Sequence, residues 1–327
     1  YRNVETFRSW TGQLDMVVNK NNQNLARTLP VEAPLIQPYL QRFDQHVEAG
    51  LSQLRWNTPH ADVGAFIEEC FETVNIVDEI TETMKINLTN VNNIMEKWSS
   101  KPLMERKPRP VDREETDRNH KTVKAARYAE IKDGGKEIHQ LLKDTNKVLR
   151  VSNASPDWRA YVDFVNNIVV DGLASSITVS LEYFLDQIDP VAIEKGAKQP
   201  MLEIKLDLVG TEVKFDPVLA ANNGKGIRDL VDSWIGSFMQ IATLFKRLDN
   251  DGTYMREMHS DSDVCLLLAI IEDTLEGNNN ELAELRGKFE AHSYLWLTDL
   301  ETYFKEFCED AVTHTELASY LDLDKFD

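Results

Sequence analysis

The sequence predicts a mainly α protein made of elongated helical bundles, with long antiparallel helices and one small β-hairpin. Apolar residues recur every three or four positions over most of the 327 residues, which is the spacing of one helix face. One stretch, 201–219, instead alternates apolar and polar residues around a glycine, as hairpins do. Because the chain is longer than one usual compact core, we expect either subdomains or one elongated helical body.

Composition argues against some classes of partner. The chain carries 36 Lys and Arg against 55 Asp and Glu, a formal charge of −19 that would repel a nucleic-acid backbone. Its 42% hydrophobic and 28% charged residues lie in the range of folded proteins. No apolar run approaches the ~20 residues that span a bilayer, and the N-terminus has no signal-like segment. We therefore expect no nucleic acid and no membrane as partner.

The cysteines indicate a reducing compartment. Cys70, Cys265 and Cys308 are far apart, and no CxxC pattern occurs. Each lies in an apolar helical pattern, so we expect three buried free thiols. The first residue is Tyr1 and not a methionine, and we expect the chain to be an excised portion of something longer.

The first part of the chain, 1–58, predicts N-terminal helices. Helical apolar spacing begins the segment 1–30 and then gives way to the polar patch NKNNQN. A second stripe begins near Pro34 and ends near RWNTPH, because Pro59 disfavours helical geometry in the residue before it.

The second part, 59–190, predicts a bundle of three long helices. The first stripe runs from about His60 to Trp98 and would form a helix about 58 Å long, which implies bundle or coiled-coil packing. The second ends at Leu149 and can fold back antiparallel on the first. The third begins at Ser155-Pro156, where a hydroxyl N-cap precedes a proline in the first helical position.

A basic loop, 99–115, separates the first two of these helices. It contains three prolines and is the only basic stretch of an acidic chain. One interpretation is a solvated loop between helices. The other is a contact with an acidic partner surface. The residues that would make this contact are Lys101, Arg106, Lys107 and Arg109.

The third part, 191–225, is predicted to be a β-hairpin junction. A two-residue type II′ turn at Gly210-Thr211 would put the apolar residues of both strands on one face, and Pro217 would end the second strand. The cross-strand pairs would be Leu208 with Val213 and Leu206 with Phe215. Two strands alone are marginally stable, so this face must lie on a helix or join other strands.

The last part, 226–327, predicts a second helical bundle. Ser262 can cap one helix, EGNNNE marks a break or a mobile corner, and helical spacing then resumes from Leu282 to about Ala311. This last stretch is rich in aromatic residues: Phe289, Tyr294, Trp296, Tyr303, Phe304 and Phe307.

Two stretches superficially resemble ligand sites. NGKGIRD could be a phosphate-binding turn, but Asp229 stands at the third glycine position of GxGxxG, where it would repel a phosphate. DNDGTY could be a calcium loop, but alignment on Gly252 puts Arg247 at the first ligand position. No HExxH or zinc spacing occurs. The sequence predicts no catalytic, cofactor-binding or metal-binding residue.

Six stretches in one order resemble a known family. They are GLSQLRWNT, NNIMEKWSSKPLMER, IKDGGKEIHQLL, WRAYVDFVNNIVVDGL, PMLEIKLDLVGTEVKFDPVL and FEAHSYLW. Together they resemble the stem, or tail, of axonemal dynein heavy chains, in the region that leads into the linker of the motor, with the outer-arm type favoured. The resemblance covers the chain from about Pro34 onward.

This resemblance implies a structural, force-transmitting segment of a minus-end-directed microtubule motor in the cytoskeleton of a cilium or flagellum. Implied partners are other dynein heavy chains, dynein intermediate and light chains, and docking proteins of the doublet microtubule. In this family the ATP-hydrolysing ring lies further along the chain. The segment itself is therefore expected to be no enzyme and to hold no cofactor.

Two alternatives have different sequence requirements. A non-motor scaffold or tethering rod of the spectrin-like type would have the same long helices but no reason to contain a hairpin at a defined place. A helical enzyme of the terpenoid synthase type would need clustered metal-binding aspartates such as DDxxD, and the sequence contains none.

Overall fold

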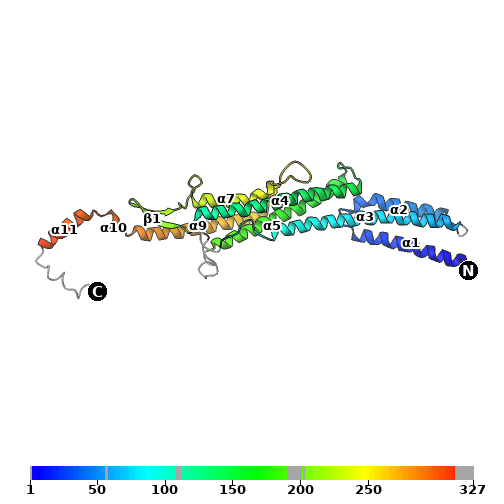
Figure 1. The fold of residues 1–327 in the computed structure, drawn as a ribbon, viewed down its shortest axis with the longest axis horizontal. Helices are drawn as coiled ribbons and strands as arrows, with labels where there is room; N and C mark the ends of the chain where they lie inside the picture. Colours follow the sequence, from blue (N-terminus) through cyan, green and yellow to red (C-terminus); the bar gives the residue numbers. More distant parts are fainter. Residues whose placement is uncertain (1, 56–57, 108–111, 190–200, 202, 314–327) are drawn as a thin grey trace.

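The computed structural model of the chain describes residues 2–55, 58–107, 112–189, 201 and 203–313. These residues form a long rod of helices that carries one hairpin, as Figure 1 shows. The mainly α fold with elongated bundles and one small hairpin is therefore confirmed.

The elements follow one another in a simple order. The helices of the first half are α1 (Arg2–Arg27), α2 (Ala33–Gln53), α3 (His60–Ser99), α4 (Arg113–Leu149) and α5 (Pro156–Ile188). The second half contains β1 (Lys205–Val209), β2 (Glu212–Asp216), α7 (Ile227–Met239), the 3₁₀ helix η1 (Gln240–Thr243), α8 (Met255–Ser260), α9 (Ser262–Glu290), α10 (Tyr294–Leu297) and α11 (Leu300–Thr313).

Three of the predicted helices have the expected bounds. α3 is 40 residues long and begins directly after Pro59. α4 runs back antiparallel to α3, as the chain colours in Figure 1 show. α5 has Ser155 as its N-cap residue and a proline in its first turn, although the serine hydroxyl makes no capping hydrogen bond.

The N-terminal end of the rod has a small core of its own. α1 and α2 both pack on α3 and bury Val17, Phe43, Cys70 and Val74 between them. α1 continues through the polar patch that the sequence placed after it. The patch is compatible with a helix because Lys20, within it, forms an ion pair of 3.0 Å with Asp78 of α3.

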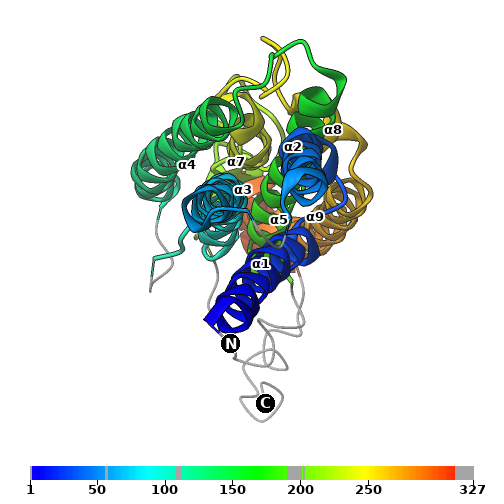
Figure 2. The ribbon, with the colours of Figure 1, turned by 90° about the vertical axis from the view of Figure 1, so that its right-hand side faces the viewer.

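The main core surrounds α5. α3, α7, α8 and α9 all contact this helix, and α4 packs on α3 and α7. Figure 2, which views the rod from its N-terminal end, shows α3 and α5 in the middle of the other helices. One cluster of buried side chains extends from Leu35 to Ile271. Residues from the predicted long-helix bundle and from the predicted second bundle therefore share one core.

Helix α5 is the one helix among the described residues that is long and apolar enough to cross a membrane by length and composition. This finding differs from the expectation that no apolar run comes near that length. In the structure Val169, Leu173 and Ile177 of α5 are fully buried among other helices. The apolar composition therefore fits a core helix that has neighbours on several sides.

Two details predicted for α9 are wrong. EGNNNE is neither a break nor a corner, because α9 runs through it without interruption. Asn278 in this stretch donates a hydrogen bond of 3.0 Å to the carbonyl of Ile188, which anchors the polar turn to the end of α5. The N-cap residue is Asp261 and not Ser262, since the Asp261 carboxylate accepts from the backbone N–H groups of Asp263 and Val264.

The burial predicted for the cysteines is correct for only one of them. Cys70 is buried in the small core, whereas Cys265 and Cys308 are exposed. Apolar spacing could not separate these positions, because α9 and α11 each have a side that no other described helix covers.

The hairpin has the predicted register. Leu206 pairs with Phe215 and Leu208 with Val213, and Gly210 at the turn has a φ of 66°. Its apolar face lies on a helix, as expected: β2 contacts α9, and Phe215 is buried. Figure 1 shows the hairpin beside the outer half of α9, while α7 turns back onto the main bundle. The predicted division into four parts stays a prediction.

A histidine is buried where α4 meets α7. The ring of His120 packs between Trp234 and Phe238, and its Nε2 atom lies 3.0 Å from the Ser237 hydroxyl. Burial, with a smaller contribution from the charge of Lys124, lowers the pKa of His120 from 6.5 to about 4. The folded chain therefore holds this imidazole neutral.

Acid should destabilise the fold through this residue. Between pH 6.5 and pH 4 the unfolded chain binds a proton at His120 that the folded chain excludes, so stability falls as the pH decreases. Between pH 7 and pH 5 we expect this group to lower the free energy of unfolding by about 1–2 kcal/mol. Urea unfolding of the chain and of His120→Gln at both pH values tests this, because the substitution should remove that part of the pH dependence. An equal pH dependence in the two proteins would contradict the assignment.

Candidate interaction surface

The predicted partner-contact loop lies against α5. Leu103 and Met104 are buried. The backbone N–H of Leu103 donates to the hydroxyl of Ser180, and that of Arg106 donates to the hydroxyl of Tyr183, both at 3.0 Å. Residues 103–106 of the loop are therefore held in place by the bundle.

The cations of this loop differ in how they are engaged. Lys101 is exposed, Arg106 donates from Nη1 to Oε1 of Gln187 at 3.2 Å, and Lys107 forms an ion pair of 2.6 Å with Glu115. Arg109 lies outside the described residues. The predicted contact with an acidic partner stays a prediction.

A buried arginine closes the end of α3 above this loop. Arg127 of α4 donates from Nη2 to the carbonyls of Trp98 and Lys101, at 2.6 and 2.9 Å, and it forms an ion pair with Glu130. Burial alone would raise the pKa of the Glu130 carboxyl, but hydrogen bonds and charges from Lys97 and Arg127 hold it below its ordinary value. This arginine serves as a structural cap.

The largest uncovered apolar surface lies at the other end of the molecule. It comprises the outer half of α9, α10 and α11, which we call the apolar arm. Its exposed side chains are Leu285, Phe289, Tyr294, Leu295, Leu297, Leu300, Tyr303, Phe304 and Phe307. Figure 1 shows α10 and α11 beyond the end of the bundle.

Helix α11 has one apolar face. Leu300, Tyr303, Phe304 and Phe307 follow the i, i+3, i+4, i+7 spacing of a single face, and each is more than 60% exposed. Covering one such side chain is worth about 1.5–3 kcal/mol. A contiguous apolar surface of this kind is typical of an interaction site. The sequence marked these aromatic residues as helical but could not distinguish a core face from a docking face.

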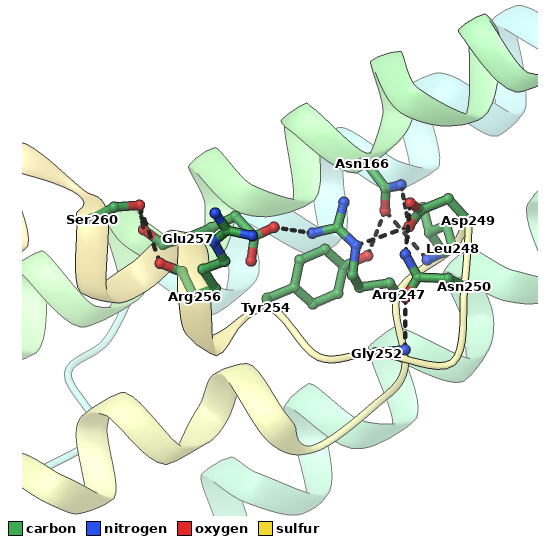
Figure 3. A network of polar contacts seen from close by, with 10 residues as sticks. All are labelled: Asn166, Arg247, Leu248, Asp249, Asn250, Gly252, Tyr254, Arg256, Glu257 and Ser260. Carbon is green, nitrogen blue, oxygen red and sulfur yellow. Dashed lines mark hydrogen bonds and ion pairs between the residues drawn. The ribbon is translucent and has the colours of Figure 1, made fainter.

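A polar network joins the turn between η1 and α8 to α5, as Figure 3 shows. Asn166 of α5 accepts from the hydroxyl of Tyr254 at 2.7 Å and donates to Asp249 at 2.9 Å. Arg247 pairs with Asp249 at 2.9 Å and also with Glu257, and its guanidinium stacks over the ring of Tyr254. We call this segment, 244–254, the corner.

The network has the properties of a structural clamp. Burial would raise the pKa of the Asp249 carboxyl, but hydrogen bonds from Arg247 and Asn166 hold it below its usual value. Burial raises the pKa of the Tyr254 phenol. Asp249 is therefore ionised and paired, Tyr254 is neutral, and no acid–base pair of the catalytic kind results. In the described part of the chain no group of His, Cys, Asp and Glu residues could hold a metal ion.

The glycine-rich turn before α7 is closed by its own aspartate. The Asp229 carboxylate accepts from the backbone N–H groups of Asn222 and Gly226, at 2.6 and 3.0 Å. These backbone hydrogen bonds lower the pKa of the Asp229 carboxyl. Since a carboxylate occupies donors that a phosphate would need, the geometry argues against a nucleotide at this turn.

Comparisons with known proteins give a consistent result. A family model described as "Dynein heavy chain, N-terminal region 1" matches residues 1–66. The chain is 34% identical over 313 residues to the dynein beta chain of the flagellar outer arm of Chlamydomonas reinhardtii, and 28% identical over 314 residues to a ciliary dynein beta chain of Tripneustes gratilla. It is 18% identical over 324 residues to the dynein-1-alpha heavy chain of the flagellar inner arm I1 complex of Chlamydomonas reinhardtii.

These matches cover most of this chain but little of the relatives. They span 95%, 94% and 93% of the chain, in the same order. The chain spans only 7% of the length of each relative.

Loss of the clamp should loosen the corner. Asn166→Ala leaves the Tyr254 hydroxyl and the Asp249 carboxylate without a buried partner, so we expect the free energy of unfolding to fall by about 1–3 kcal/mol. Urea unfolding measures this loss, and limited proteolysis should show faster cleavage within 244–254. Asn93→Ala, at an exposed position of α3, serves as the matched control and should change neither result. Unchanged stability of Asn166→Ala would show that the network does not hold the corner.

Proposed function

This chain is related to the axonemal dynein heavy chains, as its sequence predicts, and from that premise we propose that it is a stem segment that transmits force. The segment would connect the motor of the whole heavy chain to its attachment in a cilium or flagellum. Identity is higher to the outer-arm chain than to the inner-arm chain, which supports an outer-arm role.

The observation that carries this proposal is the continuous core. Buried side chains from Leu35 to Ile271 form one cluster along the rod. Close-packed interiors resist deformation, because bending must separate packed side chains. The contacts are close: a Cβ atom added at Gly172 of α5 would lie 2.2 Å from the sulfur of Met95 on α3. A rod without a hinge in this core suits a part that carries load.

The partners belong to the proposal. We infer that the apolar arm packs against further helices of the same heavy chain, because the relatives are far longer than this segment and α11 presents an uncovered apolar face. Other dynein heavy chains, intermediate and light chains, and docking proteins of the doublet microtubule would bind elsewhere on the stem. Lys101, Arg106, Lys107 and Arg109 would contact an acidic neighbour.

The segment would not perform the chemistry of the motor. The clamp and the closed glycine turn give its polar groups structural partners, which supports a non-enzymatic role. ATP hydrolysis and movement along microtubules would belong to other parts of the whole heavy chain. The hairpin docked on α9 favours this assignment over a plain spectrin-like rod.

A charged α11 face should separate assembly from catalysis. In the whole heavy chain that carries this segment, we expect Tyr303→Asp with Phe304→Asp to abolish incorporation into the ciliary arm, because an aspartate cannot be buried there without a partner. ATP turnover by the purified variant should stay within about twofold of the unmodified protein. Electron microscopy of axonemes and a phosphate-release assay measure the two properties.

The control places the same charges on the opposite face of α11. Thr302→Asp with Lys305→Asp, at exposed polar positions, should leave both incorporation and ATP turnover unchanged. Normal incorporation of the Tyr303 and Phe304 variant, or loss of its ATP turnover with incorporation intact, would contradict the proposal.

A further inference from the structure

A stripe of basic side chains runs along α4 beside the corner. Lys132, Lys136, His139 and Lys143 are spaced by four, three and four residues, which puts them on one helix face over about 17 Å. The three lysines are exposed, and His139 Nε2 lies 3.1 Å from the carbonyl of Lys246 in the corner.

Two grooves adjoin this stripe. The first has a volume of about 550 Å³ and lies between the stripe and the corner, with Leu244 and Phe245 among its apolar lining residues. The second has a volume of about 700 Å³ and reaches Trp158 and Val162 of α5. Both grooves are lined by His139, Leu248 and Asp249, so they form one continuous trough, which we call the α4 trough.

The charge of the α4 trough is opposite to that of the chain. Six cations line it: Lys132, Lys136, Lys143, Arg159, Lys246 and Arg247. Three carboxylates line it: Asp163, Asp249 and Asp251. Two of these carboxylates are already paired, Asp249 with Arg247 and Asp251 with Lys246. Lys132, Lys143 and Arg159 form no salt bridge with any described residue, although the chain as a whole carries a charge of −19.

We propose that the α4 trough binds an acidic peptide segment of a partner protein. Carboxylates of the peptide would pair with Lys132, Lys136 and Lys143 on one rim, and its apolar side chains would lie over Phe245 and Leu248. This combination of an apolar floor and a charged rim is that of a protein interface. The inference depends on the trough alone and not on the proposed function.

Other anions fit the trough less well. A long nucleic acid would extend past it over a surface with a large negative charge, which repels phosphates. A flat bilayer surface would meet the exposed lysines but could not reach residues at the floor such as Phe245, which is 9% exposed. A short acidic peptide avoids both difficulties.

Fluorescence anisotropy of the full 327-residue chain tests the proposal. The probe is a labelled short peptide of alternating glutamate and phenylalanine. We expect its Kd to rise by at least about tenfold when Lys132, Lys136 and Lys143 are all changed to glutamate. Higher salt should also weaken binding, because the contacts are solvent-exposed ion pairs. A second peptide with glutamine in place of glutamate should bind at least about tenfold more weakly.

The matched control changes three exposed lysines elsewhere, Lys85, Lys225 and Lys305, to glutamate and so gives the same net charge. We expect this control to keep the Kd within about twofold, and circular dichroism should show equal helix content in all three proteins. Equal weakening by both triple variants, no weakening by the trough variant, or equal binding of the glutamine peptide would overturn the proposal. Tighter binding of single-stranded DNA or of phosphatidylserine vesicles than of the acidic peptide would overturn it as well.

Discussion

The structure depends on the burial of α5. This helix is apolar on most of its circumference, and its buried residues include Trp158, Val165, Leu173 and Phe184. A helix with apolar residues on every side needs neighbours on every side. α3, α7, α8 and α9 supply them, which explains why the chain returns to the bundle after the hairpin. With about 1.5–3 kcal/mol for each buried large side chain, this requirement outweighs the preferences of the loops.

Polar groups fix how the other helices meet α5. The carbonyl of Trp98, near the end of α3, accepts from Ser176 of α5 and from Arg127 of α4, so one acceptor ties three helices together. Asn166 does the same for the corner. Gly135 allows Phe245 to lie against α4, since a Cβ atom there would meet the phenylalanine ring at 2.4 Å. Buried hydrogen bonds of this kind set the register of helices that apolar contacts alone would leave adjustable.

Much of the fold could be predicted from local sequence patterns. Proline and apolar spacing set the bounds of α3, and alternation around Gly210 set the hairpin register. The errors fall where a pattern has two physical outcomes. An apolar stripe on α11 is the same whether a partner covers it or solvent does, and Cys308 is exposed for that reason. The polar run at Asn278 continues a helix because the carbonyl of Ile188, distant in sequence, accepts its hydrogen bond. The basic stripe of α4 has a helical spacing, but its grooves depend on the corner, more than a hundred residues away.

The central claim is that the core around α5 makes the rod one mechanical unit. Hydrogen exchange of the intact chain, followed by mass spectrometry across a urea series, tests it most directly. The account predicts that amides of α5 and of the inner half of α9 become exposed together, with the same opening free energy as global unfolding. Earlier opening of α7 to α9 as a separate unit, while α3 and α5 stay protected, would contradict it.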